Sequence, residues 1–383
     1  MLLAAACGLT AANIYYAQPL IGLIAPAVGL GDRAASLIVT VTQIGYCIGL
    51  MLLVPLGDLV ENRALTFWTL LADVAALLAA ALAPSAMAFL SAALFIGVAS
   101  AATQMLVPIA AHLAPDATRG RTIGNVMSGL LLGIMLARPV SSLIADVFGW
   151  RAVFGVSALA ITALAFALRA RLPQRAPKVD HGYVALIASL WTLLRDTPVL
   201  RRRAAYQAAL FAAFSLFWTA VPLELAGPAF GLSQRGIALF AFAGAAGALA
   251  APIVGRIADR GWGRGATAVS MAMVAAAFPA ARIGANGSLL ALLAGAVLLD
   301  AGVQGNQVVS QRVIYALGDE ARSRLNGLYI AIFFVGGAVG SSIASLAFAS
   351  GGWERVSWIG MIFPLIALAL FAGESRRSAR MAN

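Results

Sequence analysis

The chain has 383 residues, of which 62% are hydrophobic and only 11% charged, with a formal net charge of +11 and a mean hydropathy of +0.92. Water-soluble domains are about 45–50% apolar and about 25% charged, so this composition excludes a soluble globular protein. It also argues against a membrane β-barrel, whose strands alternate apolar and polar residues. We therefore expect an all-α membrane protein.

A membrane-spanning helix needs roughly 20 apolar residues, so a chain of this length has room for about twelve. Turn signals from Gly, Pro and Asn separate the apolar runs. The predicted spans, in chain order, are 3–27, 35–57, 64–83, 87–113, 122–146, 151–169, 204–226, 235–255, 266–281, 287–314, 325–349 and 354–373. Pro279 and Arg282 shorten the apolar run of the ninth span. The first span begins close to Met1 without a basic leader, so we expect a retained helix and not a cleaved signal peptide.

Like residues recur at one constant offset in the two halves of the chain. The clearest pairs are Gln104 with Gln307, Gly124 with Gly327, Gly133 with Gly336, and Gly149-Trp150 with Gly352-Trp353. This offset is much longer than a solenoid repeat, so it predicts two similar six-helix bundles and not a repeat array. Two pseudo-symmetric membrane bundles are typical of secondary transporters. The predicted units are 1–169, a linker over 170–203, and 204–383.

Most of the 26 Lys and Arg residues lie in the loops that follow even-numbered spans and at the C-terminus. This bias predicts that both termini are cytoplasmic, and it accounts for the net charge without a nucleic-acid partner. Within the linker, apolar residues recur at helical spacing between basic flanks and predict a short helix on the bilayer surface. They are Tyr183, Ile187, Leu190, Trp191 and Leu194. We interpret this helix as a tether, with regulation as the alternative.

Residues for metal, redox or nucleotide chemistry are scarce. Cys7 and Cys47 fall inside predicted helices, and His112 and His181 are isolated, so we expect no disulfide framework and no metal site. The glycines of 336–340 stand four apart in an apolar helix, a spacing that serves helix packing more readily than nucleotide binding. We predict no cofactor and no enzymatic activity.

Two charged loops occupy matching places in the two halves. The first is Pro55-Leu56-Gly57-Asp58-Leu59-Val60-Glu61-Asn62-Arg63 and the second is Gly255-Arg256-Ile257-Ala258-Asp259-Arg260-Gly261-Trp262-Gly263-Arg264. The second loop resembles the signature loop of the major facilitator superfamily. The first keeps the Asp and a trailing Arg but lacks the flanking glycines. The resemblance implies a cytoplasmic gate, because an Asp at a helix end can bind basic side chains and helix N-termini of neighbouring helices. The implied gate residues are Asp58, Arg63, Gly255, Asp259, Arg260 and Arg264.

The resemblance covers the whole chain and is strongest to the branch of drug:proton antiporters and sugar-efflux proteins. It is carried by Tyr15-Tyr16-Ala17-Gln18-Pro19-Leu20, Arg119-Gly120-Arg121, Gly149-Trp150-Arg151 and Leu299-Asp300-Ala301-Gly302-Val303-Gln304. In the fifth span, Gly124 and Gly133 keep the spacing of the antiporter motif. The sequence then departs from that motif, because Ala137, Arg138, Ser141 and Ser142 stand where it has Gly, Pro, Gly and Gly.

Asp73, Arg138 and Asp300 are the most informative ionisable residues within the predicted spans. A charge at the bilayer centre costs roughly 2.5–3.5 kcal/mol, so each needs a compensating role. Arg138 and Asp300 lie at depths that an Arg side chain can bridge, so a pair is possible, and a moving Arg138 would switch Asp300 between proton binding and release. Asp73 is in a span that is peripheral in the superfamily, so we interpret it first as structural and then as a further candidate for proton coupling.

Polar and aromatic stripes mark the predicted cavity. Asp300, Gln304, Gln307 and Gln311 share one face of the tenth span, and Gln207, Phe211, Phe214 and Trp218 share one face of the seventh. In the superfamily the first, fourth, seventh and tenth helices line the central cavity, so the resemblance turns these faces inward. The alternatives are a polar seam between helices and ordinary aromatic packing. The implied cavity residues are Tyr15, Gln18, Gln104, Gln207, Phe211, Phe214, Trp218, Gln304, Gln307 and Gln311.

The sequence thus predicts a monomeric twelve-helix secondary transporter of the bacterial inner membrane. We expect it to export a small organic solute, a drug-like amphipath or a sugar, in exchange for protons by alternating access. One alternative is an importer or facilitator of the same fold. Another is a membrane sensor that no longer transports. The predicted partners are the substrate, protons and the lipid bilayer.

Overall fold

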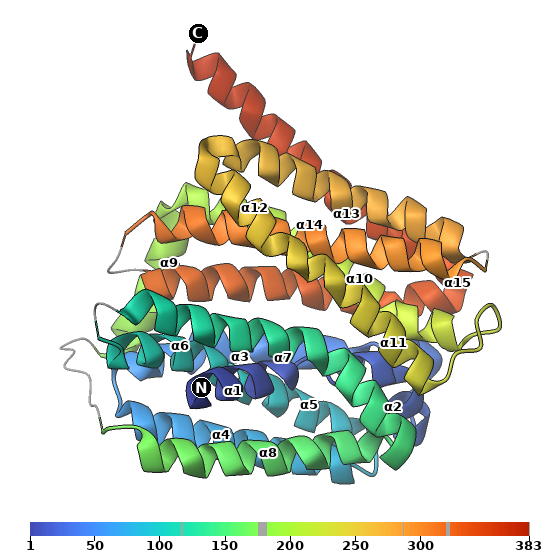
Figure 1. Cartoon of the computed structure of the whole chain (residues 1–383), viewed down its shortest axis with the longest axis horizontal. Helices are drawn as coiled ribbons and strands as arrows, with labels where there is room; N and C mark the ends of the chain where they lie inside the picture. The colour runs from blue at the N-terminus through green and yellow to red at the C-terminus, as the bar shows by residue number, and fades with distance from the viewer. Residues whose placement is uncertain (116–117, 175–181, 286, 319–321, 383) are drawn as a thin grey trace.

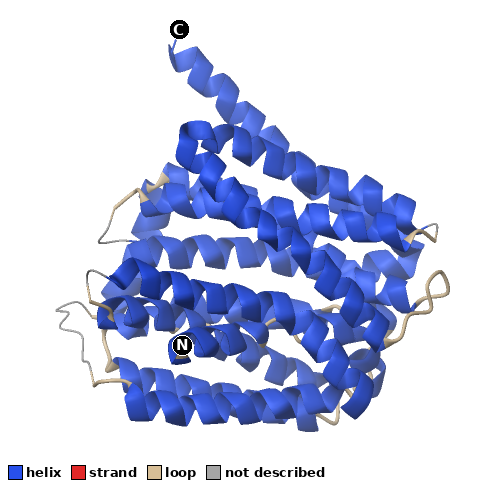
Figure 2. Ribbon diagram, in the orientation of Figure 1, coloured by secondary structure: helices blue, strands red, loops and turns tan. Residues whose placement is uncertain are grey.

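The computed structural model describes residues 1–115, 118–174, 182–285, 287–318 and 322–382. His181 lies outside these ranges. Within them every regular element is a helix (Figure 2). The helices run roughly parallel to one another, with the N-terminal half and the C-terminal half side by side, from blue to green and from yellow to red in Figure 1.

The N-terminal half contains six crossings. They are built from α1 (Leu2–Ala12), η1 (Gln18–Leu20) and α2 (Ile21–Ala27); η2 (Asp32–Ala34), α3 (Leu37–Leu52) and η3 (Val54–Asp58); α4 (Asn62–Leu82); α5 (Ala86–Ser100) and α6 (Ala102–Leu113); α7 (Arg119–Phe148); and α8 (Trp150–Arg171). The first crossing is therefore not the continuous helix that the sequence predicted. Its backbone turns between Asn13 and Ala17, where Tyr15 and Gln18 donate their N–H groups to carbonyls three residues back.

The C-terminal half follows α9 (Tyr183–Asp196). Its elements are α10 (Pro198–Ala226); α11 (Gln234–Gly244), η5 (Ala245–Ala250), α12 (Ala251–Ile257) and η6 (Ala258–Trp262); α13 (Gly263–Ala285); α14 (Leu289–Tyr315); and α15 (Arg322–Ala382). The ninth crossing, α13, is longer than predicted. Its helix continues through Pro279 and past Arg282.

The described residues contain 9 stretches that are long and apolar enough to cross a membrane. Two of them, Gln234–Gly284 and Arg324–Glu374, have 51 residues each. As single helices these would be about 75 Å long, more than twice the roughly 30 Å of a bilayer core. Each instead reverses, one at Gly261 with a φ of 87° and the other at Gly351 and Gly352. With the first crossing formed by α1 and α2, the total is twelve, as the sequence predicted.

The internal repeat has a counterpart in the backbone. Gly149 and Gly352, which form one repeat pair, both have positive φ, at 80° and 58°. This conformation is accessible to Gly at little cost and is unfavourable for residues with a Cβ. Each begins the last crossing of its half and precedes a buried Trp. A turn formed by a glycine with positive φ therefore precedes the last crossing in both halves.

The linker helix α9 contacts both halves. Tyr183 donates its hydroxyl hydrogen to the carbonyl oxygen of Leu52 at 2.9 Å, and Arg324 donates to the hydroxyl of Ser189 at 2.9 Å. Leu186 and Leu190 are buried, whereas Val184 and Trp191 are exposed. The predicted helix is present, and one of its faces packs on the protein while another faces outward. We call the side of the molecule that carries it the α9 end (Figure 1).

Hydrogen bonds between the halves gather toward the other side, which we call the far end. There Gln18 bonds to Thr219 at 3.3 Å, Thr40 to Ser341 at 2.9 Å, and the Ser36 hydroxyl accepts the backbone N–H of Ser345 at 3.4 Å. All these side chains are buried. The halves are thus joined at the far end by polar contacts that exclude solvent.

Candidate functional site

Arg138 of α7 is held between the two halves. Its side chain is 3% exposed, and its Nε donates to Oε1 of Gln18 at 2.8 Å. The guanidinium carbon lies 4.4 Å from the ring centroid of Trp218, 4.9 Å from that of Phe214 and 5.3 Å from that of Tyr15. Guanidinium groups bind favourably over aromatic faces at such distances. Its Nη2 is buried without a hydrogen-bond partner among the described residues.

Asp300 of α14 is connected to this arginine through a tryptophan. Trp218 donates its Nε1–H to Oδ1 of Asp300 at 2.8 Å, and the same indole ring lies against the Arg138 guanidinium. Arg138 and Asp300 form no ion pair in this structure. The ion pair that their depths would allow is therefore not formed; Trp218 contacts both side chains and links them in an Arg138–Trp218–Asp300 series.

A cavity of about 180 Å³ lies between the halves and extends from this series toward the α9 end. Seven of the ten residues predicted for it line its wall. They are Tyr15, Gln104, Phe211, Phe214, Gln304, Gln307 and Gln311. The wall thus combines amide groups from α6 and α14 with aromatic rings from the first crossing and α10.

The cavity wall does not include Gln18, Gln207 and Trp218. Gln18 bonds across the halves to Thr219, and Trp218 lies against Arg138 and Asp300. Gln207 accepts a hydrogen bond from Asn306 at 2.6 Å and donates to the carbonyl oxygen of Val303 at 3.3 Å. Both the oxygen and the nitrogen of its side-chain amide bond to α14, so this residue joins α10 to α14. Buried amides need such partners, and hydrophobic periodicity cannot show which polar residue on a stripe finds them.

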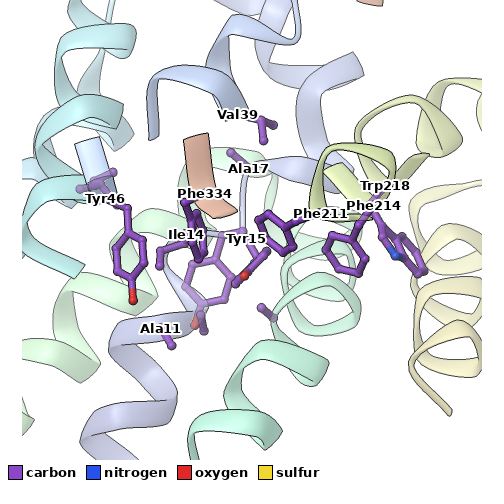
Figure 3. Close-up of a cluster of buried hydrophobic side chains, with 14 of the residues drawn as sticks. Ala11, Ile14, Tyr15, Ala17, Val39, Tyr46, Phe211, Phe214, Trp218 and Phe334 are labelled. Carbon is purple, nitrogen blue, oxygen red and sulfur yellow. The ribbon is translucent and has the colours of Figure 1, made fainter. Parts of the chain in front are cut away.

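Sequence reasoning missed the contribution of α3 and α15 to the cavity. Tyr46 of α3 and Phe334 of α15 line it, with ring centroids 4.5 Å apart. Phe334 lies 4.9 Å from Phe211, which stacks on Phe214 at 5.2 Å, and Phe214 contacts Trp218 at 6.5 Å. Figure 3 shows these rings as a row that ends at Trp218. The internal repeat gave little reason to expect α3 in the cavity wall, because the residue that corresponds to Tyr46 in the second half is not aromatic.

Asp73 of α4 lies in a separate network inside the N-terminal half. Its side chain is completely buried, and its Oδ2 accepts a hydrogen bond from Asn13 at 2.7 Å. The side-chain oxygen Oδ1 of Asn13 in turn accepts a hydrogen bond from the hydroxyl of Ser157 of α8 at 2.6 Å. Asp73 does not line the cavity between the halves. Its partners indicate that it fixes the turn after α1 against α4 and α8.

The gate residues differ between the halves. Asp259 forms an ion pair with Arg312, which belongs to the same half. Asp58 instead lies within electrostatic reach of Arg324 from the other half. The structure places the remaining predicted gate residues, Arg63, Gly255, Arg260 and Arg264, at the ends of α4, α12 and α13 and in η6, all at the α9 end. At this end Asp58 is therefore influenced electrostatically by a basic residue of the other half, whereas the ion pair of Asp259 stays within its own half.

Two six-helix halves around a polar and aromatic cavity define the class of secondary membrane transporters. A model of the Major Facilitator Superfamily matches residues 3–281 and 206–381. The chain belongs to this superfamily.

Curated relatives carry transporter names. The chain is 41% identical to the uncharacterized transporter YgaY of Escherichia coli O157:H7, over 97% of this chain and 94% of the relative. It is 34% identical to the probable transporter SCO4007 of Streptomyces coelicolor, over 93% and 82%. A chloramphenicol efflux pump of Mycobacterium tuberculosis is 25% identical over 67% of this chain and 65% of the pump.

Solved structures share the fold. The human organic anion transporter MFSD10 matches with a TM-score of 0.68 at 17% identity, covering 97% of both chains. A POT family transporter in complex with 5-aminolevulinic acid matches with a TM-score of 0.71 at 12% identity, covering 100% of this chain and 96% of the other. At these identities the similarity concerns the fold alone.

Proposed function

We propose that this transporter exports a small organic solute in exchange for protons by alternating access. The cavity between the halves is the substrate site, and Asp300 carries the coupled proton. The observation that carries the proposal is the position of Asp300. This acid lies one helical turn from Gln304 in the cavity wall and contacts, through Trp218, an arginine of the other half.

Alternating access requires a site that is closed on one side of the membrane at a time. The far-end hydrogen bonds Gln18–Thr219 and Thr40–Ser341 close one side here. The cavity extends toward the α9 end, where the basic loops predict the cytoplasm. The structure then corresponds to a state that faces the cytoplasm, from which an exporter loads its substrate.

Coupling follows from the shared indole. A proton on Asp300 removes the charge opposite Arg138, so protonation and substrate binding both change how strongly the halves hold together around Trp218. A ligand shifts such an equilibrium only through different affinities for the two states. The relation to a chloramphenicol efflux pump supports export, although that similarity covers only part of both chains.

The test uses purified protein in proteoliposomes under an imposed pH gradient. A panel of labelled sugars, amino acids, cationic drugs and organic acids is screened for uptake that reverses when the gradient is reversed. Transport against the proton flow supports the exchange. Transport along with the proton flow would identify an importer, and binding without counterflow of any probe would identify a sensor.

The orientation has its own test. Cysteines introduced at Arg235 and Arg260, which lie at the far end and the α9 end, are reacted in intact cells with a membrane-impermeant maleimide. We expect labelling at 235 and protection at 260. The reverse pattern would contradict the proposed direction of the cavity.

A further inference from the structure

The cavity has an unusual electrostatic composition. None of its described lining residues is charged; the wall consists of amides, hydroxyls, aromatic rings and aliphatic groups. A cationic solute would have no carboxylate in this wall to bind. Arg138 and Asp300 carry full charges and lie behind the end of the cavity that is nearest the far end.

Arg138 has unused binding capacity. Five N–H groups are available on a guanidinium, and the structure records one hydrogen bond from this side chain, from Nε to Gln18. Nη2 is buried and finds no hydrogen-bond partner in the part of the chain that the structure describes. A buried donor without a partner destabilises the protein, and more so when it is charged. The cost disappears when an acceptor arrives, which makes Nη2 a binding group and not merely part of the packing.

The surrounding rings place this donor next to the cavity. Tyr15 and Phe214 lie against the guanidinium, and both also line the cavity. Ile134, one turn before Arg138 on α7, lines it as well. The guanidinium therefore lies directly behind the part of the cavity wall that Tyr15 and Phe214 form.

We propose that Arg138 is an anion-binding residue and that the transported solute is an organic anion. A carboxylate or another oxyanion binds Nη2, and the apolar or aromatic body of the solute lies along the ring row from Phe214 to Tyr46. Such charge-assisted bonds to arginine are among the stronger hydrogen bonds in proteins. This inference rests on the proposed function, because it names the substrate class of the same cavity.

Asp300 gives the proposal a distinctive consequence. Its carboxylate competes electrostatically with a bound anion for Arg138, although Trp218 keeps the two side chains apart. Removing the negative charge strengthens anion binding. A guanidinium that only braced the helices would show no such effect, since no ligand would report the change.

The experiment measures binding by isothermal titration calorimetry with purified full-length protein in neutral detergent. The probes are 2-naphthoate, its neutral counterpart 2-naphthamide and the cation 2-naphthylmethylamine. We expect naphthoate to bind about 10- to 100-fold more tightly than naphthamide, the range that a charge-assisted hydrogen bond provides. Equal binding of the three probes by the natural protein would overturn the proposal.

Variants locate the effect. Arg138→Gln should remove the preference for the anion, whereas Arg138→Lys should keep part of it. Arg151→Gln is the matched control, because Arg151 also stacks on a tryptophan, Trp150, at 4.2 Å, but outside the cavity. This variant should bind the three probes as the natural protein does.

Asp300→Asn should bind naphthoate more tightly, on the order of tenfold. An unchanged preference in Arg138→Gln, or weaker anion binding in Asp300→Asn, would contradict the assignment.

A lipid phosphate shares the chemistry of a soluble oxyanion, so a second arm adds phosphatidylglycerol to the same titrations. Binding of that lipid without binding of naphthoate would overturn the assignment of a solute site. The assay needs no transport, so its failure is separate from that of the proposed function. Charge-selective binding without pH-driven transport would refute the exporter alone, and pH-driven transport with charge-indifferent binding would refute the anion site alone.

Discussion

Asp73 and Asp300 are both buried acids, but they have different surroundings. Asp73 receives its one hydrogen bond from Asn13, and every partner in its network belongs to the N-terminal half. Asp300 is bonded to Trp218, whose ring lies on an arginine of the other half, and it is one helical turn from Gln304 of the cavity wall. A proton on Asp73 can change only its own bundle, whereas a proton on Asp300 acts where the two halves meet. Burial alone therefore does not identify a coupling residue.

The largest expected effect separates these two acids by the same substitution. Asp300→Asn should abolish accumulation driven by a pH gradient but leave exchange of labelled substrate at equilibrium measurable, because an amide resembles the protonated acid and cannot titrate. Asp73→Asn should keep accumulation at nearly the natural rate, since an amide oxygen can still accept the bond from Asn13. Both rates are measured in the same proteoliposomes.

The outcome can also reverse the comparison. Full pH-driven accumulation in Asp300→Asn together with its loss in Asp73→Asn would move the coupling site into the N-terminal half. Persistence in both variants would indicate that neither acid carries the proton and that another group couples transport to the pH gradient.

Most of the fold could be predicted from the sequence, because its cause is local. The helices follow from apolar runs of membrane length, and the turns follow from the residues between those runs. The Gly-Trp turn at Gly149-Trp150 and its repeat at Gly352-Trp353 each act on residues that are near in sequence. The interruption of the first crossing at Asn13 could not be predicted in this way. It depends on Asp73 and Ser157, which are distant in sequence and supply the hydrogen bonds that the turn requires.

A second prediction compares how the two halves pack. In each half one repeat glycine lies against the backbone of a neighbouring helix: a Cβ on Gly133 would overlap the carbonyl oxygen of Gly8, and one on Gly336 would overlap that of Ala208. Gly133→Leu and Gly336→Leu should each destabilise the protein by about 1–3 kcal/mol or more, the usual cost of overpacking. Thermal unfolding in detergent measures the loss.

The repeat supplies the matched controls. Gly124 and Gly327 have no neighbouring atom within 4 Å of a Cβ, so Gly124→Leu and Gly327→Leu should unfold near the natural temperature. A large loss in only one half would show that the bundles, despite their repeat, are held together differently.

The candidate site was only partly predictable, for a physical reason. Helical periodicity shows which residues share a face, and it placed Gln304, Gln307 and Gln311 together on the cavity wall. Periodicity says nothing about rotamers or about pairing between helices. The indole between Arg138 and Asp300 and the capture of Gln207 by Asn306 both depend on such pairing.

A third prediction concerns this indole. Trp218→Phe keeps an aromatic face for Arg138 but removes the N–H that binds Asp300. We expect coupling to persist with a transport rate about 10-fold lower, the scale of one lost hydrogen bond to a charged group. The control Trp150→Phe, outside the cavity, should transport normally. A natural rate in Trp218→Phe would show that Asp300 needs no link to the other half.

The smallest effect is expected at the α9 end, where the two gate acids again differ. Asp58 acts on Arg324 of the opposite half, whereas Asp259 pairs with Arg312 inside its own half. Asp58→Asn should therefore change the balance between the two states more than Asp259→Asn. Both acids are exposed, and charge interactions between exposed groups contribute about 0–1 kcal/mol, so we expect turnover to change by no more than about fivefold. Accessibility of a cysteine at Gln307 to a soluble maleimide reports the fraction open toward the α9 end. We expect Asp58→Asn to increase labelling and Asp259→Asn to leave it nearly unchanged. Equal effects of the two substitutions would show that both loops connect the halves, and a larger effect of Asp259→Asn would reverse the assignment made from the ion pairs.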